Sequence, residues 1–328
     1  MTSPAVNIVI AAGDAASTIR ACLTETLRQA GEVGASVTVA DASADGTADI
    51  VAAEFPSVTL LRRPTTTLTP ELWRDGLQAG LSSPPHSPPW GRGGGAGDGS
   101  GSAVAPPHPF VVLSTAQMVP EPGWLSALLQ RAATGTWAGV GGCIDPAPGL
   151  CRVDTAAYLL RYTRYMTPVG EAETHDIPGD NALYATAPLA ACGDLLTAGF
   201  WEPEIHRRLF RDGGRLLLTP AATVRFVGGV GLGRFLRERF RHGRRFGADR
   251  AAREGWVLRL VRAAAAPLVP AIYLAKILGN LRRKGRMLGA FAWSLPVLTL
   301  VLTAWAAGEA LGGLFGGGLF GPGRRESP

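Results

Sequence analysis

Cysteine is scarce in this sequence, with four thiols among 328 residues. No two of them stand at the close spacing of a metal-ligand pair, so a zinc site built from paired cysteines is excluded. We interpret the thiols as buried and reduced in a cytoplasmic domain, and a Cys143–Cys151 disulfide within one loop is the alternative. The four residues are Cys22, Cys143, Cys151 and Cys192.

The N-terminus lacks the charged start and the apolar run that are typical of a signal peptide. Residues 1–7 lead directly into a strand-like pattern. We therefore expect the large N-terminal domain to stay in the cytoplasm.

The apolar and basic residues are unevenly distributed along the chain. A hydrophobic fraction of 46% and a mean hydropathy of +0.14 are high for a wholly soluble enzyme, and the excess lies at the C-terminus. A net charge of +6 and a pI of about 9.5 suit either a nucleic-acid binder or a protein held against anionic lipid. The basic residues crowd into Arg234–Arg262 and Arg282–Arg286, beside apolar segments. We therefore expect contact with anionic membrane lipids and no nucleic-acid partner.

Strand-like and helix-like patterns alternate over the first 230 residues, which predicts an α/β fold with a doubly wound, mostly parallel sheet flanked by helices. A helix over 14–29 has Asp14 or Ser17 to cap it. The expected strands are 6–12, 36–40, 58–62, 110–113, 138–144, 215–219 and 222–227, and 177–184 is expected to be a loop followed by a strand. The expected helices are 14–29, 48–55, 72–81, 124–133 and 202–209, with 153–173 unassigned.

Two further kinds of segment complete the expected organisation. Residues 82–109 are rich in Pro, Gly and Ser and cannot form a core, so we expect a disordered surface insertion in a domain that spans 1–230. Residues 231–262 form a strongly basic amphipathic pattern, which is typical of a helix at the lipid headgroup interface.

The remaining residues, 263–328, contain two apolar segments and are expected to associate with a membrane. Ala263–Leu278 is about the minimum length for a span and contains two prolines, whereas Leu288–Phe320 is longer. If both crossed, the Arg282–Lys284 loop would lie outside, against the positive-inside preference. We expect an interfacial or re-entrant first segment and at least one transmembrane helix in Leu288–Leu311, with a two-span hairpin as the alternative.

The most informative stretch begins with the apolar strand pattern over 110–113. It stops abruptly at small polar residues and then turns through Pro120, Pro122 and Gly123 into a helical pattern at Trp124. Ligands of open α/β sheets bind where strands end in such loops. We therefore expect the functional site near Thr115 and Gln117.

Several motifs, weak one by one, stand in an informative order. They are Val6–Asp14 before a helix, Val39–Thr47, Trp73–Leu77, Pro120–Trp124, Pro178–Asn181 and the acidic segment Glu202–Leu209. Together they resemble a family 2 glycosyltransferase with the GT-A nucleotide-sugar fold. The resemblance covers about residues 6 to 230, and a C-terminal membrane-anchoring tail is common among relatives.

This resemblance implies a nucleotide site at the ends of the first strands. Ala11 and Asp14 would lie beneath the nucleotide, and Asp41 would accept hydrogen bonds from the base, as a carboxylate can. Arg74 is a candidate for holding the diphosphate because its guanidinium matches phosphate oxygens. An exposed helix residue without such a role is the alternative for Arg74, and turn chemistry is the preferred interpretation of Asp45.

The family's metal-binding Asp-x-Asp motif aligns with Thr115-Ala116-Gln117, which contains no carboxylate. A hydroxyl and a neutral amide bind Mg²⁺ or Mn²⁺ poorly. Phe226 stands where the family often has a histidine that contacts the metal. The resemblance therefore implies either transfer without a tightly held metal, with the diphosphate charge met by Arg, Lys or helix N-termini, or a domain that has lost activity.

Glu202 aligns best with the family's general base, and Glu204 is a near alternative on the same turn. Stabilisation of the first helical turn is the structural alternative for both acids. His206, one turn after Glu202, could pair with it in a supporting role. Asp180 and Asn181 could bind the donor sugar or the acceptor, with a tight turn as the alternative.

The sequence thus predicts a membrane-anchored, inverting glycosyltransferase whose catalytic domain faces the cytoplasm. It would move a sugar from a nucleotide-sugar donor to a lipid-linked or cell-surface glycan acceptor. A non-catalytic nucleotide-sugar or glycan-binding relative in a membrane complex is the first alternative. A nucleotidyltransferase on a similar sheet is the second, disfavoured because that chemistry depends heavily on metal.

Overall fold

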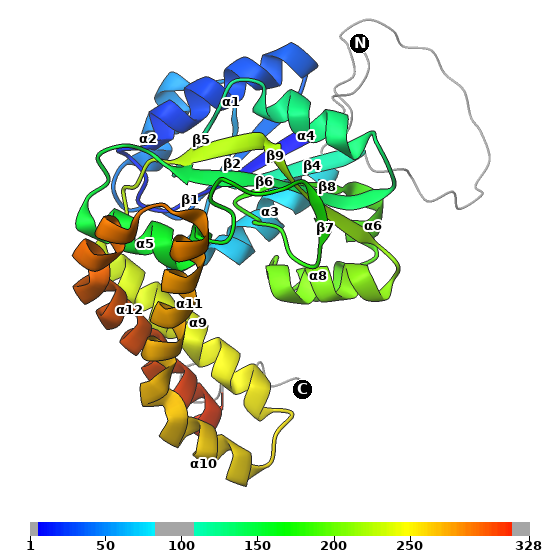
Figure 1. Ribbon diagram of the computed structural model, residues 1–328. Coiled ribbons are helices and arrows are strands. Elements are labelled where there is room, and N and C mark those ends of the chain that lie inside the picture. Colours follow the sequence, from blue (N-terminus) through cyan, green and yellow to red (C-terminus); the bar gives the residue numbers. More distant parts are fainter. Residues whose placement is uncertain (1–5, 83–107, 317–328) are drawn as a thin grey trace, which may run out of the picture. The chain divides into compact units, whose positions relative to one another are not determined.

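The computed structural model describes residues 6–82 and 108–316 (Figure 1). The described chain divides into two compact units. The first, here the sheet unit, comprises Met1–Ala147 and Tyr165–Gly229, and the second, here the helical unit, comprises Pro148–Arg164 and Val230–Pro328. The predicted insertion over 82–109 falls almost wholly outside the described residues.

The sheet unit is built on one mixed β-sheet with the order β3-β2-β1-β4-β8-β6-β9-β5, and β7 pairs with β9. β1, β2, β3, β4, β6 and β9 run in one direction, whereas β5, β7 and β8 run in the other. The strands are β1 (Val6–Ala12), β2 (Ser36–Asp41), β3 (Thr59–Arg62), β4 (Phe110–Thr115), β5 (Met118–Pro120), β6 (Trp137–Pro146), β7 (Ala172–Thr174), β8 (Asn181–Ala185) and β9 (Arg215–Phe226). The predicted α/β class with a mostly parallel sheet is confirmed.

Helices cover both faces of this sheet (Figure 1). Every residue of β1 is buried, as the unbroken apolar run predicts for a central parallel strand. The helices are α1 (Ile19–Val33), α2 (Thr47–Glu54), α3 (Thr69–Ser82), α4 (Trp124–Ala132), α6 (Thr186–Ala190), α7 (Gly193–Leu196) and α8 (Glu202–Arg211).

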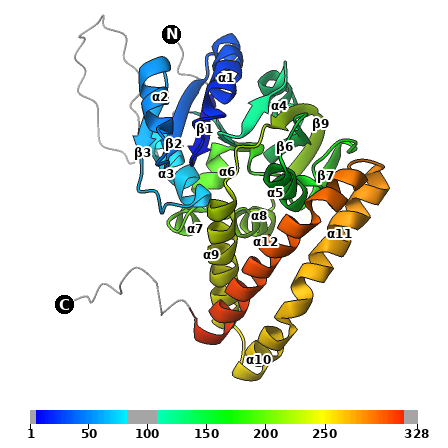
Figure 2. The same cartoon turned by 90° about the vertical axis from the view of Figure 1, so that its left-hand side faces the viewer.

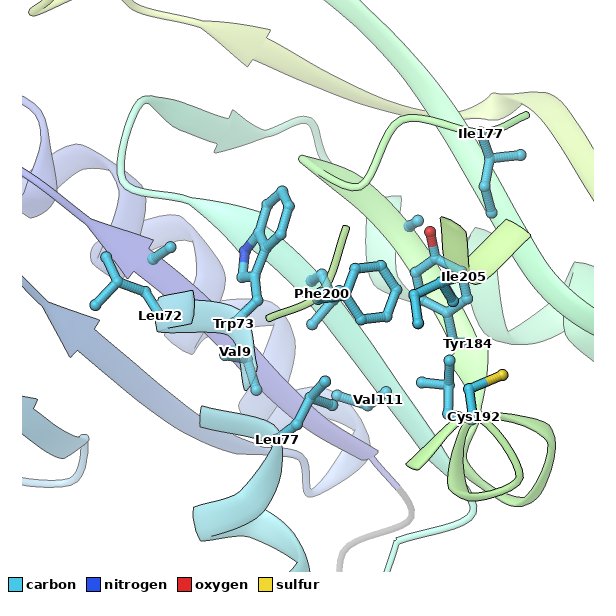
Figure 3. Close-up of a cluster of buried hydrophobic side chains, with 14 of the residues drawn as sticks. Val9, Leu72, Trp73, Leu77, Val111, Ile177, Tyr184, Cys192, Phe200 and Ile205 are labelled. Carbon is cyan, nitrogen blue, oxygen red and sulfur yellow. The ribbon is translucent and has the colours of Figure 1, made fainter. Parts of the chain in front are cut away.

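One core cluster joins α3, the central strands and α8 (Figure 3). Trp73 lies edge-on to Phe200 with ring centroids 6.2 Å apart, and Tyr184 contacts Phe200 at 5.1 Å. Val9 and Val111 project from β1 and β4 into the same cluster. This packing fixes α8 against the sheet, which matters because α8 carries the predicted general base.

Several element boundaries differ from those expected. The first helix begins at Ile19 rather than near Asp14, because Asp14 adopts a left-handed conformation with φ of 48° in the preceding loop. The two expected closing strands form one long strand, β9, whose register against β6 shifts between Gly141 and Cys143. The turn through Pro120 contains the short strand β5, and the unassigned stretch 153–173 holds one helix and β7.

The helical unit contains α5 (Arg152–Tyr162), α9 (Leu232–Ala251), α10 (Trp256–Ala265), the short 3₁₀ helix η1 (Ala266–Leu268), α11 (Val269–Lys284) and α12 (Leu288–Phe315). Trp256–Lys284 and Leu288–Phe315 are long and apolar enough to cross a membrane by length and composition. None of the most apolar window of the first is buried, whereas 33% of that of the second is buried. The predicted long apolar C-terminal helices are therefore present.

α9 and α12 lie side by side with their backbones in close contact (Figures 1 and 2). A Cβ atom at Gly308 would overlap the carbonyl oxygen of Phe240. One turn later, a Cβ at Gly312 would overlap the carbonyl oxygen of Arg244. Each helix contributes a Gly-x-x-x-Gly pair, the arrangement that lets two helices approach most closely. The pairs are Gly243 with Gly247 on α9 and Gly308 with Gly312 on α12.

All four cysteine thiols are free, so the Cys143–Cys151 disulfide alternative is wrong. Cys22, Cys143 and Cys192 are buried as expected. Cys151 is exposed, because it stands at the N-terminus of α5, where its sulfur accepts the backbone N–H of Asp154 at 3.5 Å.

Candidate active site

The predicted nucleotide-binding residues lie at the carboxyl ends of three parallel strands. Ala11 on β1 pairs with Ala40 on β2 and with Thr115 on β4. Asp41 follows at the next position and pairs with Ala12. The sheet therefore brings these segments to one edge, which is where ligands of open α/β sheets bind.

The loops after β1 and β2 are tied together by hydrogen bonds. The backbone N–H of Asp14 donates to the Ser43 hydroxyl at 2.8 Å, and the Asp14 carboxylate accepts the N–H of Ala44 at 2.9 Å. Asp45 accepts the N–H of Ala16 at 2.9 Å and that of Thr47 at 3.1 Å. Asp45 therefore has the turn role that the sequence favours, and Asp14 shapes the loop that would lie beneath a nucleotide.

Asp41 is a buried carboxyl group at the end of β2, with 2% of its surface exposed. It accepts the hydroxyl of Ser43 at 2.6 Å and the backbone N–H of Ser43 at 3.2 Å. Burial raises the pKa of Asp41 above its usual value, although the two bonds from Ser43 oppose the shift. A buried carboxylate at a strand end, held in one orientation, is suited to accept N–H donors from a base.

We expect Asp41→Asn to weaken nucleotide binding by about tenfold while leaving the thermal stability at pH 7 unchanged or higher. Because the pKa of Asp41 is raised in the folded state, folding favours the protonated form, and ionisation of Asp41 destabilises the fold as pH rises through that pKa. The variant should therefore gain stability relative to the wild type between pH 4 and pH 7. Thermal unfolding across this range and titration with nucleotide measure both effects. A loss of stability at pH 7 without weaker binding would contradict this assignment.

Thr115 is the last residue of β4, and Gln117 follows it in the turn to β5. Thr115 is buried, and within the described residues its Oγ1 has no hydrogen-bond partner. Gln117 is partly buried, and its backbone carbonyl accepts the N–H of Val227 at 2.9 Å. A buried hydroxyl without a partner is uncommon in folded proteins, and a ligand group can supply one.

These residues do not fit a divalent metal. The donors at this position are a hydroxyl and a neutral amide, and hard cations prefer carboxylate oxygens. Among residues 6–82 and 108–316 there is no group of three or more His, Cys, Asp or Glu side chains that could hold a metal ion.

Arg74 lies on α3 and is not a free surface residue. Its guanidinium pairs with Asp75 at 2.7 Å and donates to the carbonyl of Thr197 at 3.1 Å. Arg63 binds the same carboxylate at 2.5 Å. Two guanidinium groups thus share one carboxylate, and Glu71 on the first turn of α3 adds a second carboxylate to the same helix.

Glu202 at the start of α8 binds the loop that precedes β8. Its carboxylate accepts the backbone N–H of Gly179. A Cβ atom at Gly179 would overlap this carboxylate, so a larger residue there would displace the Glu202 side chain. Because Asn181 pairs with Ser114, the loop enters β8 beside the end of β4. Glu202 is therefore anchored at the edge of the sheet where β4 ends.

The other acids of this region have different surroundings. Glu204 lies on the first turn of α8, partly exposed, where its carboxylate is favoured by the helix dipole. Asp180 is buried, with 5% of its surface exposed, in the loop that Glu202 binds. Glu202 and Asp180 thus lie in adjoining segments, whereas Glu204 has the features of a structural residue.

Asn181 is wholly buried and its amide is committed to the sheet unit. Its side-chain nitrogen donates to the carbonyls of Cys143 at 2.8 Å and Ala222 at 3.2 Å. Its side-chain oxygen accepts the indole N–H of Trp124 at 2.7 Å. This amide joins β6, β9 and α4, so the geometry favours a packing role over the sugar contact expected from the sequence.

We expect Asn181→Ala to lower the free energy of unfolding by at least about 3 kcal/mol, because one buried donor and two buried acceptors would lose their partner. Chemical denaturation of the full chain in detergent measures this loss. Gln130→Ala, at an exposed position near the end of α4, is the matched control and should change stability by less than about 0.5 kcal/mol. Equal effects of the two substitutions would contradict the packing role.

His206 belongs to a buried polar network that sequence reasoning missed. Its Nδ1 lies 3.0 Å from the Asp176 carboxylate and its Nε2 lies 2.9 Å from the Tyr184 hydroxyl. Tyr165 donates to the second oxygen of Asp176 at 2.8 Å. Both ring nitrogens of His206 are therefore used here, which corrects the expected pairing with Glu202.

This network links α8 to β8 and to the segment between β7 and β8. Burial, followed by the charges of Glu202 and Asp176, raises the pKa of Tyr184 well above its usual value, so its hydroxyl stays protonated. The Asp176 carboxylate is an acceptor, so Nδ1 of His206 donates to it. Only His206 had a recognisable signal in the sequence, because its partners lie in segments that the sequence does not pair.

No protein-family model matches this sequence, and no curated protein sequence matches it. Solved structures do match. S. aureus TarS is 11% identical over 72% of this chain and 38% of that chain, with a TM-score of 0.43. S. aureus TarS 1–349 in complex with UDP-GlcNAc is also 11% identical, over 72% of this chain and 64% of that chain, with a TM-score of 0.43.

GalNAc-T7 with UDP, GalNAc and Mn²⁺ is 12% identical over 68% of this chain and 43% of that chain, with a TM-score of 0.46. The present chain thus spans less than two thirds of the length of each of these structures. At such identities and TM-scores the likeness is too distant to assign an activity.

Proposed function

We propose that this chain is a membrane-anchored, inverting glycosyltransferase of the GT-A type. It would use a nucleotide-sugar donor and a lipid-linked or cell-surface glycan acceptor, with its catalytic domain in the cytoplasm. The observation that carries the proposal is the placement of Glu202. Its carboxylate is held by Gly179 at the sheet edge where β4 ends, and the candidate nucleotide-binding Asp41 lies at the same edge.

The reaction assigns one role to each carboxylate. Asp41 accepts hydrogen bonds from the base of the donor and so fixes its orientation. Glu202 takes the proton of the acceptor hydroxyl as the oxygen attacks the anomeric carbon. The bond from that carbon to the diphosphate oxygen breaks on the opposite side, which inverts the configuration and releases a nucleoside diphosphate. The products are the glycosylated acceptor, the nucleoside diphosphate and the proton held by Glu202.

The leaving diphosphate needs charge compensation that Thr115 and Gln117 do not provide. Arg74 is the candidate for meeting this charge, because its guanidinium matches phosphate oxygens and is held on α3 by Asp75 and by the carbonyl of Thr197. Metal-independent transfer remains part of the proposal.

The helical unit would hold the enzyme at the membrane. Its two long apolar helices support this role, and its arginines complement anionic lipid. An acceptor attached to lipid would then lie in the same membrane as the enzyme.

Membranes that contain the full chain, incubated with radiolabelled nucleotide sugars, test the proposed function. We expect a labelled lipid-extractable or glycan product together with nucleoside diphosphate. Binding of a nucleotide sugar without turnover would instead favour the non-catalytic alternative, for which the missing carboxylates at Thr115 and Gln117 are the specific observation. Release of inorganic diphosphate would identify a nucleotidyltransferase.

A further inference from the structure

We propose that the helical unit binds one leaflet of an anionic membrane without crossing it, through the exposed apolar surface of α10, η1 and the first half of α11. This inference rests on the membrane association proposed above but not on glycosyl transfer. It replaces the expectation of a transmembrane helix in Leu288–Leu311. Four features of the helical unit carry it: the direction of α9, its charge, the position of α5 and the distribution of exposed apolar side chains.

The two glycine pairs show that α9 and α12 run in the same direction. Gly308 meets the backbone at Phe240, and Gly312 meets it four residues later at Arg244. From the α9 side, Gly247 meets Glu309. The C-terminal half of α12 is therefore paired along its length with α9, and the two segments must lie at similar depths relative to a bilayer.

α9 is too highly charged to lie in hydrocarbon. Charged side chains within a bilayer are rare and need partners. The arginines of α9 extend from one end of the helix to the other, and they are Arg234, Arg237, Arg239, Arg241, Arg244, Arg245 and Arg250. The pairing extends this constraint to α12, where Arg250 of α9 binds Glu309 at 2.8 Å. The C-terminal half of α12 is thus held at the aqueous side or the headgroup region.

The N-terminal end of α12 is held on the same side by α5. Arg152 lies over the ring of Trp293 at 5.2 Å, and Lys284, just before α12, donates to the carbonyl of Arg164 at 3.2 Å. α5 is joined to β6 by the short connection 147–151. Five residues reach at most about 18 Å, less than the hydrocarbon thickness of about 30 Å. α5 therefore cannot lie on the opposite side of the membrane from β6.

Both ends of α12 are accordingly held on one side of the membrane. The stretch of α12 between them is too short to cross the hydrocarbon layer and return. Gly308 of α12 contacts α9 at Phe240, and Leu232, the first residue of α9, lies eight residues before Phe240. Because the two helices run in the same direction, Leu232 lies beside about residue 300 of α12. Only about a dozen residues, or about 18 Å of helix, separate that level from Leu288. A single span and a hairpin are both incompatible with these contacts.

The surface that would enter the leaflet lies on α10, η1 and α11. Large apolar side chains here are unusually exposed, and none of the most apolar window is buried. They include Trp256 at 72%, Leu268 at 62%, Val257 and Val261 at 57% and Ile272 at 50%. An exposed patch of this kind on a helix marks an interaction surface.

The positive charge of the helical unit indicates that its exposed apolar surface binds anionic lipid. Residues 230–316 contain fifteen Arg and Lys against four Asp and Glu, a formal net charge of +11 in a chain whose total is +6. A headgroup layer of negative charge attracts such a segment while the apolar side chains insert. A second copy of this chain would carry the same positive charge and is disfavoured by repulsion.

Cysteine labelling in intact cells tests the topology. In a Cys151→Ser background, single cysteines are placed by Arg283→Cys at the end of α11, Phe315→Cys at the end of α12 and Gln130→Cys on α4 of the sheet unit. A membrane-impermeant maleimide is applied before and after detergent. We expect all three sites to share one side of the membrane. Labelling of Phe315→Cys alone from outside would establish a single span, and labelling of Arg283→Cys alone would establish a hairpin; either outcome overturns the inference.

Flotation with vesicles tests the surface itself. The full chain should float with vesicles that contain phosphatidylglycerol, and the double variant Trp256→Asp with Val261→Asp should reduce binding at least tenfold. Val33→Asp, at an exposed apolar position on α1 of the sheet unit, is the matched control and should float like the wild type. Unchanged flotation of the double variant, or no binding of the wild-type chain to vesicles, would refute the surface as a lipid contact. Neither experiment uses donor or acceptor, so a failure of the proposed transfer activity would be separately visible.

Discussion

Replacing Glu202 by glutamine is expected to lower the rate of sugar transfer by about 10²–10⁴-fold, the usual contribution of a general base. Glutamine keeps the size of the side chain and can still accept the Gly179 N–H, so the loop before β8 should keep its position. The affinity for the nucleotide should stay unchanged, because Asp41, the proposed contact of the nucleobase, belongs to β2. Initial rates with a labelled donor, nucleotide titration and thermal unfolding of the same preparation separate these effects.

Two further variants show whether the loss of activity is specific to Glu202. Glu204→Gln decides between the two acids of the first turn of α8, and it should reduce the rate only slightly if Glu202 is the base. Glu32→Gln, on the exposed end of α1, is the control for loss of a surface carboxylate. Full activity of Glu202→Gln would remove the general base from the account, and a large loss in Glu204→Gln alone would transfer the role to that residue.

Gly312→Leu is expected to destabilise the helical unit, because the backbones of α9 and α12 leave no room for a side chain at this position. Overpacking of this kind costs about 1–3 kcal/mol, and more where backbone must move. We expect a melting temperature several degrees lower in detergent. We also expect faster tryptic cleavage within α9, whose arginines become accessible when the two helices separate.

Gly313→Leu is a close control, since a Cβ atom at Gly313 would meet nothing within 4 Å. The two substitutions add the same side chain to adjacent positions of α12 and differ only in the face of the helix. Similar melting temperatures and cleavage rates for both variants would show that the glycine contact between α9 and α12 does not form in solution.

The strands of the N-terminal half could be predicted because each is a continuous apolar run, which is the pattern of a buried strand. β1, β2 and β4 are apolar runs bounded by Gly, Asp or Ser, and a central parallel strand needs no more than that. β9 could not be foreseen as one strand, because Pro220 interrupts the pattern and the shifted register opposite Gly141 and Cys143 depends on a distant partner.

The candidate site was predicted in part, for a related reason. Asp41 and Glu202 stand at a strand end and a helix start, positions that sequence patterns locate well. The roles of Asn181 and His206 depend on tertiary partners: Asn181 binds Trp124, and His206 binds Asp176 and Tyr184. Likewise, the sequence of α9 predicts an amphipathic helix but not its packing against α12, because a Gly-x-x-x-Gly spacing does not indicate which helix it contacts.

The most direct test of the central claim is the thermal stabilisation of the full chain by a panel of nucleotide sugars, with and without EDTA. We predict that at least one nucleotide sugar raises the melting temperature, that EDTA leaves this shift unchanged, and that Asp41→Asn reduces it. Stabilisation by no nucleotide sugar, or stabilisation that disappears in EDTA, would contradict a metal-independent nucleotide-sugar site built on Asp41, Thr115 and Glu202.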